Sequence, residues 1–253
     1  MKIFFYKYGS ICEPDISDSF RRLGFEVIDE DMEIYNKNLL PSQCVETVSK
    51  KLIDGQFTFV FTINFFPWLS DLCEIMHLKY ISLIVDSPVL ELYSYSLKND
   101  CNRIFLFDRC LYNEFEPFNQ GHIFHVPLAA DVNRIQNVIK NASEKAKFAS
   151  DISFIGSTYQ EKCPFNRSEL NDADRGFTDG IIEAQLKVYG YNFIEELITE
   201  DFATRFLEAT PGSYRFPESY RQKNRALVAQ AVYKCKSRRT GTPSCFTHVI
   251  RQL

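Results

Sequence analysis

Short apolar runs alternate with longer amphipathic runs over the first half of the chain. Apolar runs of four to eight residues predict strands, and the more polar stretches between them predict helices. The expected strands cover 2–7, 25–30, 57–64, 79–86, 103–108 and 122–128, and the expected helices lie near 15–23, 39–54, 68–77, 89–98 and 109–118. This alternation is typical of βαβ units and a parallel sheet.

Two of the expected strands are apolar almost without interruption, which indicates burial on both faces of the sheet. They contain FTFVFTI at 57–63 and ISLIV at 81–85. Crossover connections between parallel strands are nearly always right-handed, so the default arrangement is a doubly wound sheet. We therefore expect residues 1–130 to form a Rossmann-like α/β domain.

The pattern changes after residue 130. Residues 131–150 are polar and predict a linker helix, and DISFIGS at 151–157 predicts one more strand that ends in a turn. Helical spacing then recurs at 178–198, where Gly190 marks a helix end or a kink, and further helices are expected at 200–209 and 218–236. The region 151–234 is thus predicted to be mainly helical, and 235–253 is a tail without a pattern that resembles translation in a shifted frame.

Composition and charge exclude several classes of protein. The formal net charge of −4 and the pI of about 5.7 argue against nucleic-acid binding, which usually needs a basic face. The chain contains no run of about 18 apolar residues, so we expect no membrane span. The eight cysteines form no C-x-x-C pair, and the apolar start is interrupted by Lys2 and Lys7. We therefore expect no metal site, no signal peptide and a cytoplasmic protein with reduced thiols.

Polar residues follow several expected strands, and ligands bind parallel sheets at the carboxyl ends of their strands. Asn64, the pair Asp86 and Ser87, and Asp108 lie at three such ends. Asp86 fits a carboxylate that binds a sugar hydroxyl or acts as a general base. The same stretch also fits a plain turn, in which Ser87 is the N-cap of a helix that begins at Pro88.

Other candidates have simpler interpretations. Asp108 is typical of a helix cap, and His125 lies within an apolar strand as a core residue. Gly156 and Ser157 form the turn at the end of the stretch 151–157 and are predicted to bring the backbone close to a phosphate. The single glycine is much less specific than a complete glycine-rich fingerprint.

Four stretches together resemble the bacterial glycosyltransferases related to the spore-maturation protein CgeB. They are SLIVDSPVLELYSYSLKNDCNRIFLFDR, HIFHVPLAADVNRI, DISFIGSTYQEKCPFNR and GFTDGIIEAQLKVYGYNFIEELIT. The resemblance lies in the order and spacing of these stretches and covers most of residues 1–230. It implies the GT-B architecture, in which two Rossmann-like domains face each other across a cleft.

The resemblance implies a metal-independent transfer of a sugar from a nucleotide-sugar to a carbohydrate or protein acceptor. The nucleotide-sugar is a co-substrate, and no cofactor is expected. Asp86 would be the catalytic residue, Asn64, Ser87 and Asp108 would line the acceptor side, and Gly156 and Ser157 would contact the donor diphosphate. A homo-oligomer is a further possibility.

The chain departs from this family after residue 151, because most strands of the donor-side domain are missing. We therefore expect a truncated or frameshifted member that does not transfer sugars by itself. Two alternatives stay open: a non-catalytic module that binds a sugar or a protein through its first domain, and a genetic remnant without function.

Overall fold

The structure is a computed structural model that describes residues 1–36, 39–87, 89–138, 143, 146–147, 149–152, 168–210, 225–226, 228–229 and 231–232. The chain divides into two compact units, Met1–Phe148 and Ala149–Leu253.

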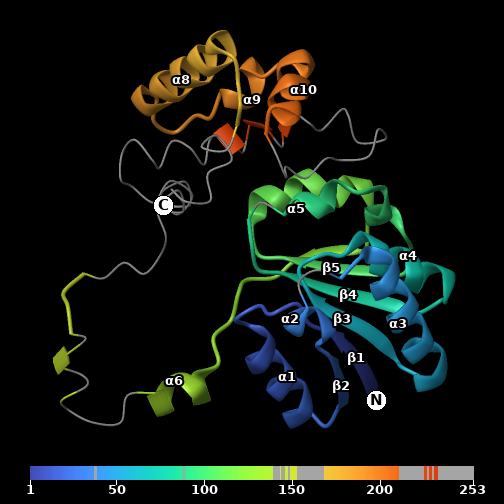
Figure 1. Ribbon diagram of the computed structural model, residues 1–253. Coiled ribbons are helices and arrows are strands. Elements are labelled where there is room, and N and C mark those ends of the chain that lie inside the picture. The colour runs from blue at the N-terminus through green and yellow to red at the C-terminus, as the bar shows by residue number, and fades with distance from the viewer. Residues whose placement is uncertain are drawn as a thin grey trace. The chain divides into compact units, whose positions relative to one another are not determined.

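The first unit contains a sheet of six parallel strands, which confirms the expected α/β fold (Figure 1). The strands are β1 Lys2–Tyr6, β2 Glu26–Glu30, β3 Phe59–Ile63, β4 Lys79–Ile84, β5 Asn102–Leu106 and β6 Ile123–His125. Their order in the sheet is β2-β1-β3-β4-β5-β6, with every neighbouring pair parallel. The order reverses between β1 and β3, and such a switch point is where doubly wound sheets form their ligand crevice.

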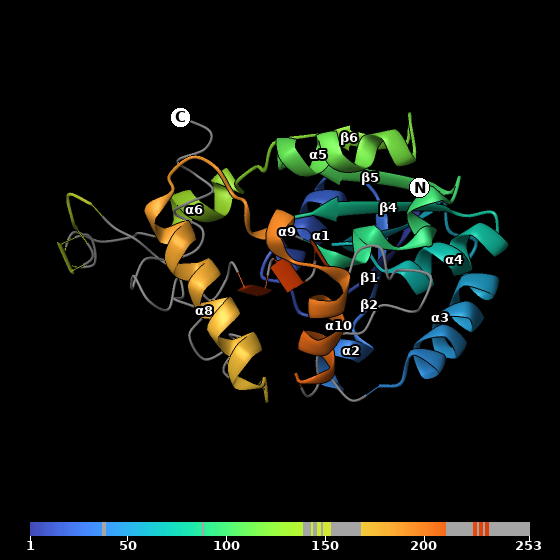
Figure 2. The same ribbon diagram turned by 90° about the horizontal axis from the view of Figure 1, so that it is seen from above.

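The helices of the first unit follow the strands as the sequence pattern predicts, with a few differences. They are α1 Glu13–Arg22, α2 Met32–Tyr35, α3 Pro41–Gly55, α4 Pro67–Ile75, α5 Arg109–Phe115 and α6 Val132–Val138, with 3-10 helices η1 Leu90–Tyr93, η2 Tyr95–Lys98 and η3 Glu116–Phe118. The short helix α2 was not expected, and α6 lies within the expected linker. From above, α3 and α4 lie beside each other along the sheet (Figure 2).

The prediction of one helix at 89–98 is wrong, because this segment forms η1 and η2. The side chain of Asn102 donates hydrogen bonds to the carbonyls of Ser96 (2.7 Å) and Leu97 (3.0 Å). Asn119 donates a second bond to the Leu97 carbonyl over 2.7 Å. These amides bind carbonyl groups that a continuous α-helix would use for its own hydrogen bonds.

The strand expected at 122–128 is also shorter than predicted, since β6 ends at His125. The next amide, that of Val126, still donates to the Leu106 carbonyl over 2.9 Å. Pro127 has no backbone N–H, so the ladder cannot continue past this point.

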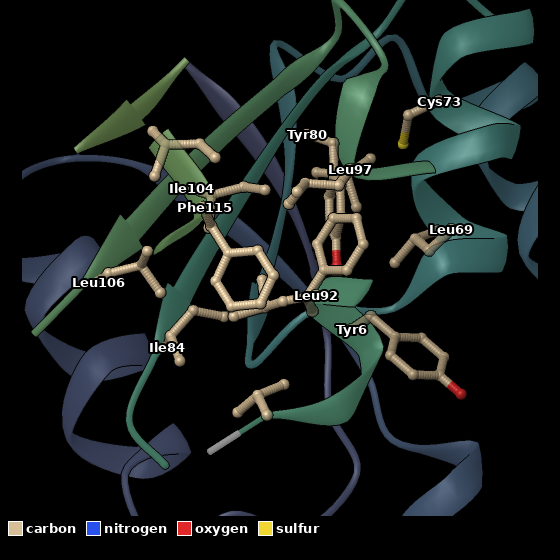
Figure 3. Packing of buried hydrophobic residues seen from close by; sticks show 14 of the residues in the cluster. Tyr6, Leu69, Cys73, Tyr80, Ile84, Leu92, Leu97, Ile104, Leu106 and Phe115 are labelled. Atoms are coloured by element: carbon tan, nitrogen blue, oxygen red, sulfur yellow. The ribbon is translucent and has the colours of Figure 1, made fainter. Parts of the chain in front are cut away.

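Hydrophobic residues fill both faces of the sheet, as the doubly wound arrangement requires. One face packs against α3, α4, α5 and the 3-10 helices, and its core includes Tyr6, Leu69, Tyr80, Ile84, Leu92, Ile104 and Phe115 (Figure 3). The other face carries Ile3, Phe5, Val27, Phe61 and Ile63, against which Ile16 and Phe20 of α1 pack. Hydrophobic packing on both faces therefore holds the strands in place up to their carboxyl ends.

The described part of the second unit is helical, with α8 Asp172–Lys187, α9 Ile194–Leu197 and α10 Glu200–Glu208. Helix α8 begins after the N-cap Asn171 and ends at Lys187, three residues before Gly190, which has a φ of +81°. Arg205 binds both carboxylate oxygens of Asp174, over 2.8 and 2.9 Å, and joins α10 to α8. Helices were therefore correctly expected here, with different bounds.

The expected strand at 151–157 and the expected helix at 218–236 fall largely outside the described residues, and the tail at 235–253 falls wholly outside them. In the part of the chain that the structure describes, none of the helices has the length and apolar character of a membrane span. The five cysteines within that part are free thiols.

Candidate functional site

The candidate site lies at the carboxyl edge of the sheet, where the segments that follow β1, β3, β4 and β5 place polar side chains. Asn64 follows β3, Asp86 and Ser87 follow β4, and Asp108 follows β5. Tyr8 follows β1 and adds a hydroxyl at the switch point. The sheet order makes β3 the neighbour of both β1 and β4, so these segments come together.

Asn64 connects three of these segments through its side chain. Its Nδ2 donates to Asp86 Oδ2 over 2.6 Å and to the Tyr8 hydroxyl over 2.9 Å. Its Oδ1 accepts a hydrogen bond from the backbone N–H of Val85 over 3.1 Å. The amide is thus fixed on both sides, which holds the Asp86 carboxylate at a defined position on the edge.

The backbone of Asn64 has a left-handed conformation, with a φ of +57°. Asparagine is one of the few residues other than glycine that adopts this conformation readily. The carbonyl of Asn64 accepts hydrogen bonds from the hydroxyls of Thr62 (2.6 Å) and Ser82 (2.9 Å), both of which lie in the sheet. The turn after β3 is therefore held by the two strands beneath it.

Asp86 and Asp108 differ in exposure and in partners. Asp86 is exposed, and among the described residues its carboxylate receives the hydrogen bond of Asn64 through one oxygen. Asp108 is only 3% exposed, and its two oxygens accept from the Ser87 hydroxyl (2.5 Å) and from the Cys110 backbone N–H (2.7 Å). Asp86 is thus the carboxylate that a ligand in solvent can reach.

The contacts of Asp108 confirm its interpretation as a helix cap, because the Cys110 N–H belongs to the first turn of α5. The expectation that Ser87 caps the next helix is wrong. Helix η1 begins at Leu90 with Val89 at its N-cap, and the Ser87 hydroxyl donates to Asp108 instead. Pro88, the expected start of that helix, lies outside the described residues.

Burial and negative charge raise the pKa of two groups near Asp86. Burial raises the pKa of the Tyr8 phenol, and the charge of Asp86 adds to this effect. Burial likewise raises the pKa of Glu91 in η1, with a further contribution from Asp86. Both shifts favour the neutral form of the group, as desolvation and a nearby like charge do in general.

Tyr8 and Glu91 were not singled out from the sequence. Tyr8 follows the first strand, so the rule that assigns ligands to strand ends could have identified it. Glu91 belongs to the segment 89–98, which was wrongly predicted as one helix. Its position near Asp86 therefore could not be predicted. His125 packs its ring against Tyr112 of α5 with 5.9 Å between the centroids, but it is half-buried and is not the core residue that the sequence predicts.

Gly156 and Ser157, the predicted contacts of a donor diphosphate, lie outside the described residues. No three His, Cys, Asp or Glu side chains in the described ranges come together as a group that could hold a metal ion.

Two comparisons with known proteins give no family for this chain. No protein-family model matches it, and no curated protein matches it.

Proposed function

We propose that the first unit is the acceptor-side domain of a CgeB-like glycosyltransferase and binds a hydroxylated acceptor at the carboxyl edge of its sheet. The observation that carries this proposal is the exposed carboxylate of Asp86, which Asn64 holds over 2.6 Å beside the switch point. The family resemblance of the four sequence stretches supplies the reaction, which is transfer of a sugar from a nucleotide-sugar to a carbohydrate or protein.

Asp86 fits the role of the group that binds or deprotonates the acceptor hydroxyl. Asn64 donates to Oδ2, which leaves Oδ1 to accept a hydrogen bond from a sugar hydroxyl. A general base must lie within hydrogen-bond distance of the proton that it removes, and an exposed carboxylate is accessible to a bound acceptor hydroxyl. Ser87 and Asp108 support this position, because their mutual hydrogen bond ties the segment after Asp86 to β5 and α5.

A second candidate function is binding without catalysis, in which the first unit recognises a saccharide or a protein. This alternative is favoured by the described part of the second unit, where the residues from 168 to 210 form helices α8, α9 and α10. Binding alone does not involve the predicted donor-phosphate residues Gly156 and Ser157. Binding without catalysis therefore requires only the carboxyl edge of the sheet at Asp86.

The two functions are separated by measuring saccharide binding and nucleotide-sugar turnover on the same protein. A panel of methyl glycosides is titrated by calorimetry, and sugar release from UDP- and GDP-sugars is followed with and without the glycosides. A chain that transfers sugars by itself should show turnover that Asp86→Asn abolishes while glycoside binding persists, because the amide keeps the size and polarity of the carboxyl group. Glycoside affinity without turnover is expected both of a truncated, inactive transferase and of a binding module. The equivalent substitution in a full-length relative then separates these two, because only a transferase has turnover to lose.

Asp54→Asn is the matched control, since Asp54 is an exposed carboxylate near the end of α3, at the opposite edge of the sheet. This variant should behave as the unmodified protein in both assays. Absence of both glycoside affinity and turnover would overturn both candidate functions.

A further inference from the structure

The turn after β1 forms the other side of the switch point, and its backbone amides are bound by a side chain of the protein. The N–H of Tyr8 donates to Glu13 Oε1 over 2.9 Å. The N–H of Gly9 donates to both carboxylate oxygens of Glu13, over 3.2 and 3.1 Å. Glu13 is the first residue of α1 and is only 2% exposed, so its carboxylate lies beneath the turn and not in solvent.

In doubly wound folds the amides of this turn and the start of the following helix are the usual binding site for a phosphate. The carboxylate of Glu13 takes the place of such an anion. A phosphate at this turn would have to displace Glu13 and leave a buried carboxylate without its hydrogen-bond donors. Such a loss is unfavourable because a buried charge depends on its partners.

The remaining groups at the switch point also disfavour an anion. Asp86 is exposed beside Asn64, where its carboxylate would repel an anion. Lys7 lies next to the turn, but its ammonium group binds Asp29 over 2.8 Å. The uncharged groups at this edge, the Tyr8 hydroxyl and the Asn64 amide, offer an anion no positive charge.

We propose that Glu13 determines ligand specificity: it occupies the anion position of the switch-point turn and excludes phosphorylated ligands from this edge. Together with the proposed function, on which this part of the inference rests, Glu13 restricts the acceptor to uncharged polyhydroxy compounds. A donor diphosphate would then have to bind elsewhere in the protein. The exclusion of phosphate itself does not depend on whether the ligand is a saccharide.

The test follows the backbone amides of Tyr8 and Gly9 by NMR in the full chain while inorganic pyrophosphate is added. The unmodified protein should show no saturable shift at either amide. Glu13→Ser frees both amides and should produce a saturable shift at Tyr8 and Gly9. Glu13→Gln keeps an acceptor oxygen but removes the charge, so it should respond at higher pyrophosphate concentration than Glu13→Ser.

Asp15→Asn is the matched control, because Asp15 is also an acid in the first turn of α1 but binds Arg134 instead of the turn. This variant should stay unresponsive to pyrophosphate. A saturable shift at Tyr8 and Gly9 in the unmodified protein would overturn the proposal. The absence of any shift in folded Glu13 variants would overturn it as well, and Glu13→Gln decides the matter if Glu13→Ser does not fold.

Methyl glycosides are then added to the same samples, with the amides of Val85 and Asp86 as reporters. If pyrophosphate behaves as expected and no glycoside shifts these amides, the proposed saccharide binding fails while the role of Glu13 stands. If glycosides bind and the unmodified protein also binds pyrophosphate at the turn, the role of Glu13 fails while saccharide binding stands.

Discussion

Asn64 Nδ2 lies 2.6 Å from Asp86 Oδ2, so an amide at the end of β3 holds a carboxylate at the end of β4. Asn64 adopts a φ of +57° and also accepts a hydrogen bond from the Val85 N–H. The residue therefore has two separate roles, as a turn former and as a hydrogen-bonding side chain.

Replacing Asn64 separates these two roles. Asn64→Gly keeps the left-handed backbone but loses the side-chain bonds, and we expect the free energy of unfolding to fall by about 1–2 kcal/mol. Asn64→Ala loses the same bonds and adds about 1 kcal/mol, because a Cβ disfavours positive φ. Urea denaturation of the two variants measures the difference, and equal losses would contradict the backbone role.

The segment after Asp86 gives a second prediction, because Ser87 and Asp108 share one hydrogen bond while Asp108 also caps α5. Asp108→Ala removes both interactions, and loss of the cap alone costs about 1 kcal/mol. Ser87→Ala removes only the shared bond, so it should lower the free energy of unfolding by a smaller amount, about 0.5–1.5 kcal/mol. A larger loss in Ser87→Ala than in Asp108→Ala, by urea denaturation, would refute this assignment.

The strands and the fold class could be predicted because they depend on local pattern. The residues of β3 are buried on both faces, whereas β4 is buried on one face and half-buried on the other. Both strands leave a nearly continuous apolar signal in the sequence. The cap of α5 is equally local, because Asp108 accepts from the N–H of Cys110 two residues later, whereas the cap expected at Ser87 is wrong.

The contacts that shape the site could not be predicted because they join residues far apart in the chain. Tyr8 and Asn64 are 56 positions apart, and only the sheet order brings them together. The 3-10 helices at 90–98 depend in the same way on Asn119, whose amide reaches the Leu97 carbonyl from beyond β5. The hydrogen bonds of Glu13 to the turn are local, but nothing in the pattern distinguishes this acid from Asp15.

The turn after β3 at the site is also held by Tyr80, which is fully buried in β4. Its hydroxyl lies 2.7 Å from Thr62 Oγ1 and accepts a hydrogen bond from the N–H of Phe66 over 3.0 Å. Tyr80→Phe leaves the Phe66 N–H without this acceptor, which should cost about 1–3 kcal/mol of unfolding free energy. Tyr112→Phe is the control, because the described contact of Tyr112 is through its ring, and it should cost less in the same thermal or urea denaturation.

Asp29 gives a prediction about pH. Burial alone would raise its pKa, but hydrogen bonds from Lys7 and Arg21 hold the pKa below its ordinary value. A carboxyl group with a depressed pKa in the folded state stabilises the fold above its unfolded-state pKa of about 3.9, and this contribution is lost as pH falls through the folded-state pKa. Asp29→Asn should therefore lower the free energy of unfolding at pH 7, and the difference from the unmodified protein should shrink steadily below about pH 4. Urea denaturation at a series of pH values measures the difference in unfolding free energy between Asp29→Asn and the unmodified protein. Asp54→Asn is the exposed control. A difference that does not change with pH would show that the ion pairs of Asp29 do not stabilise the fold.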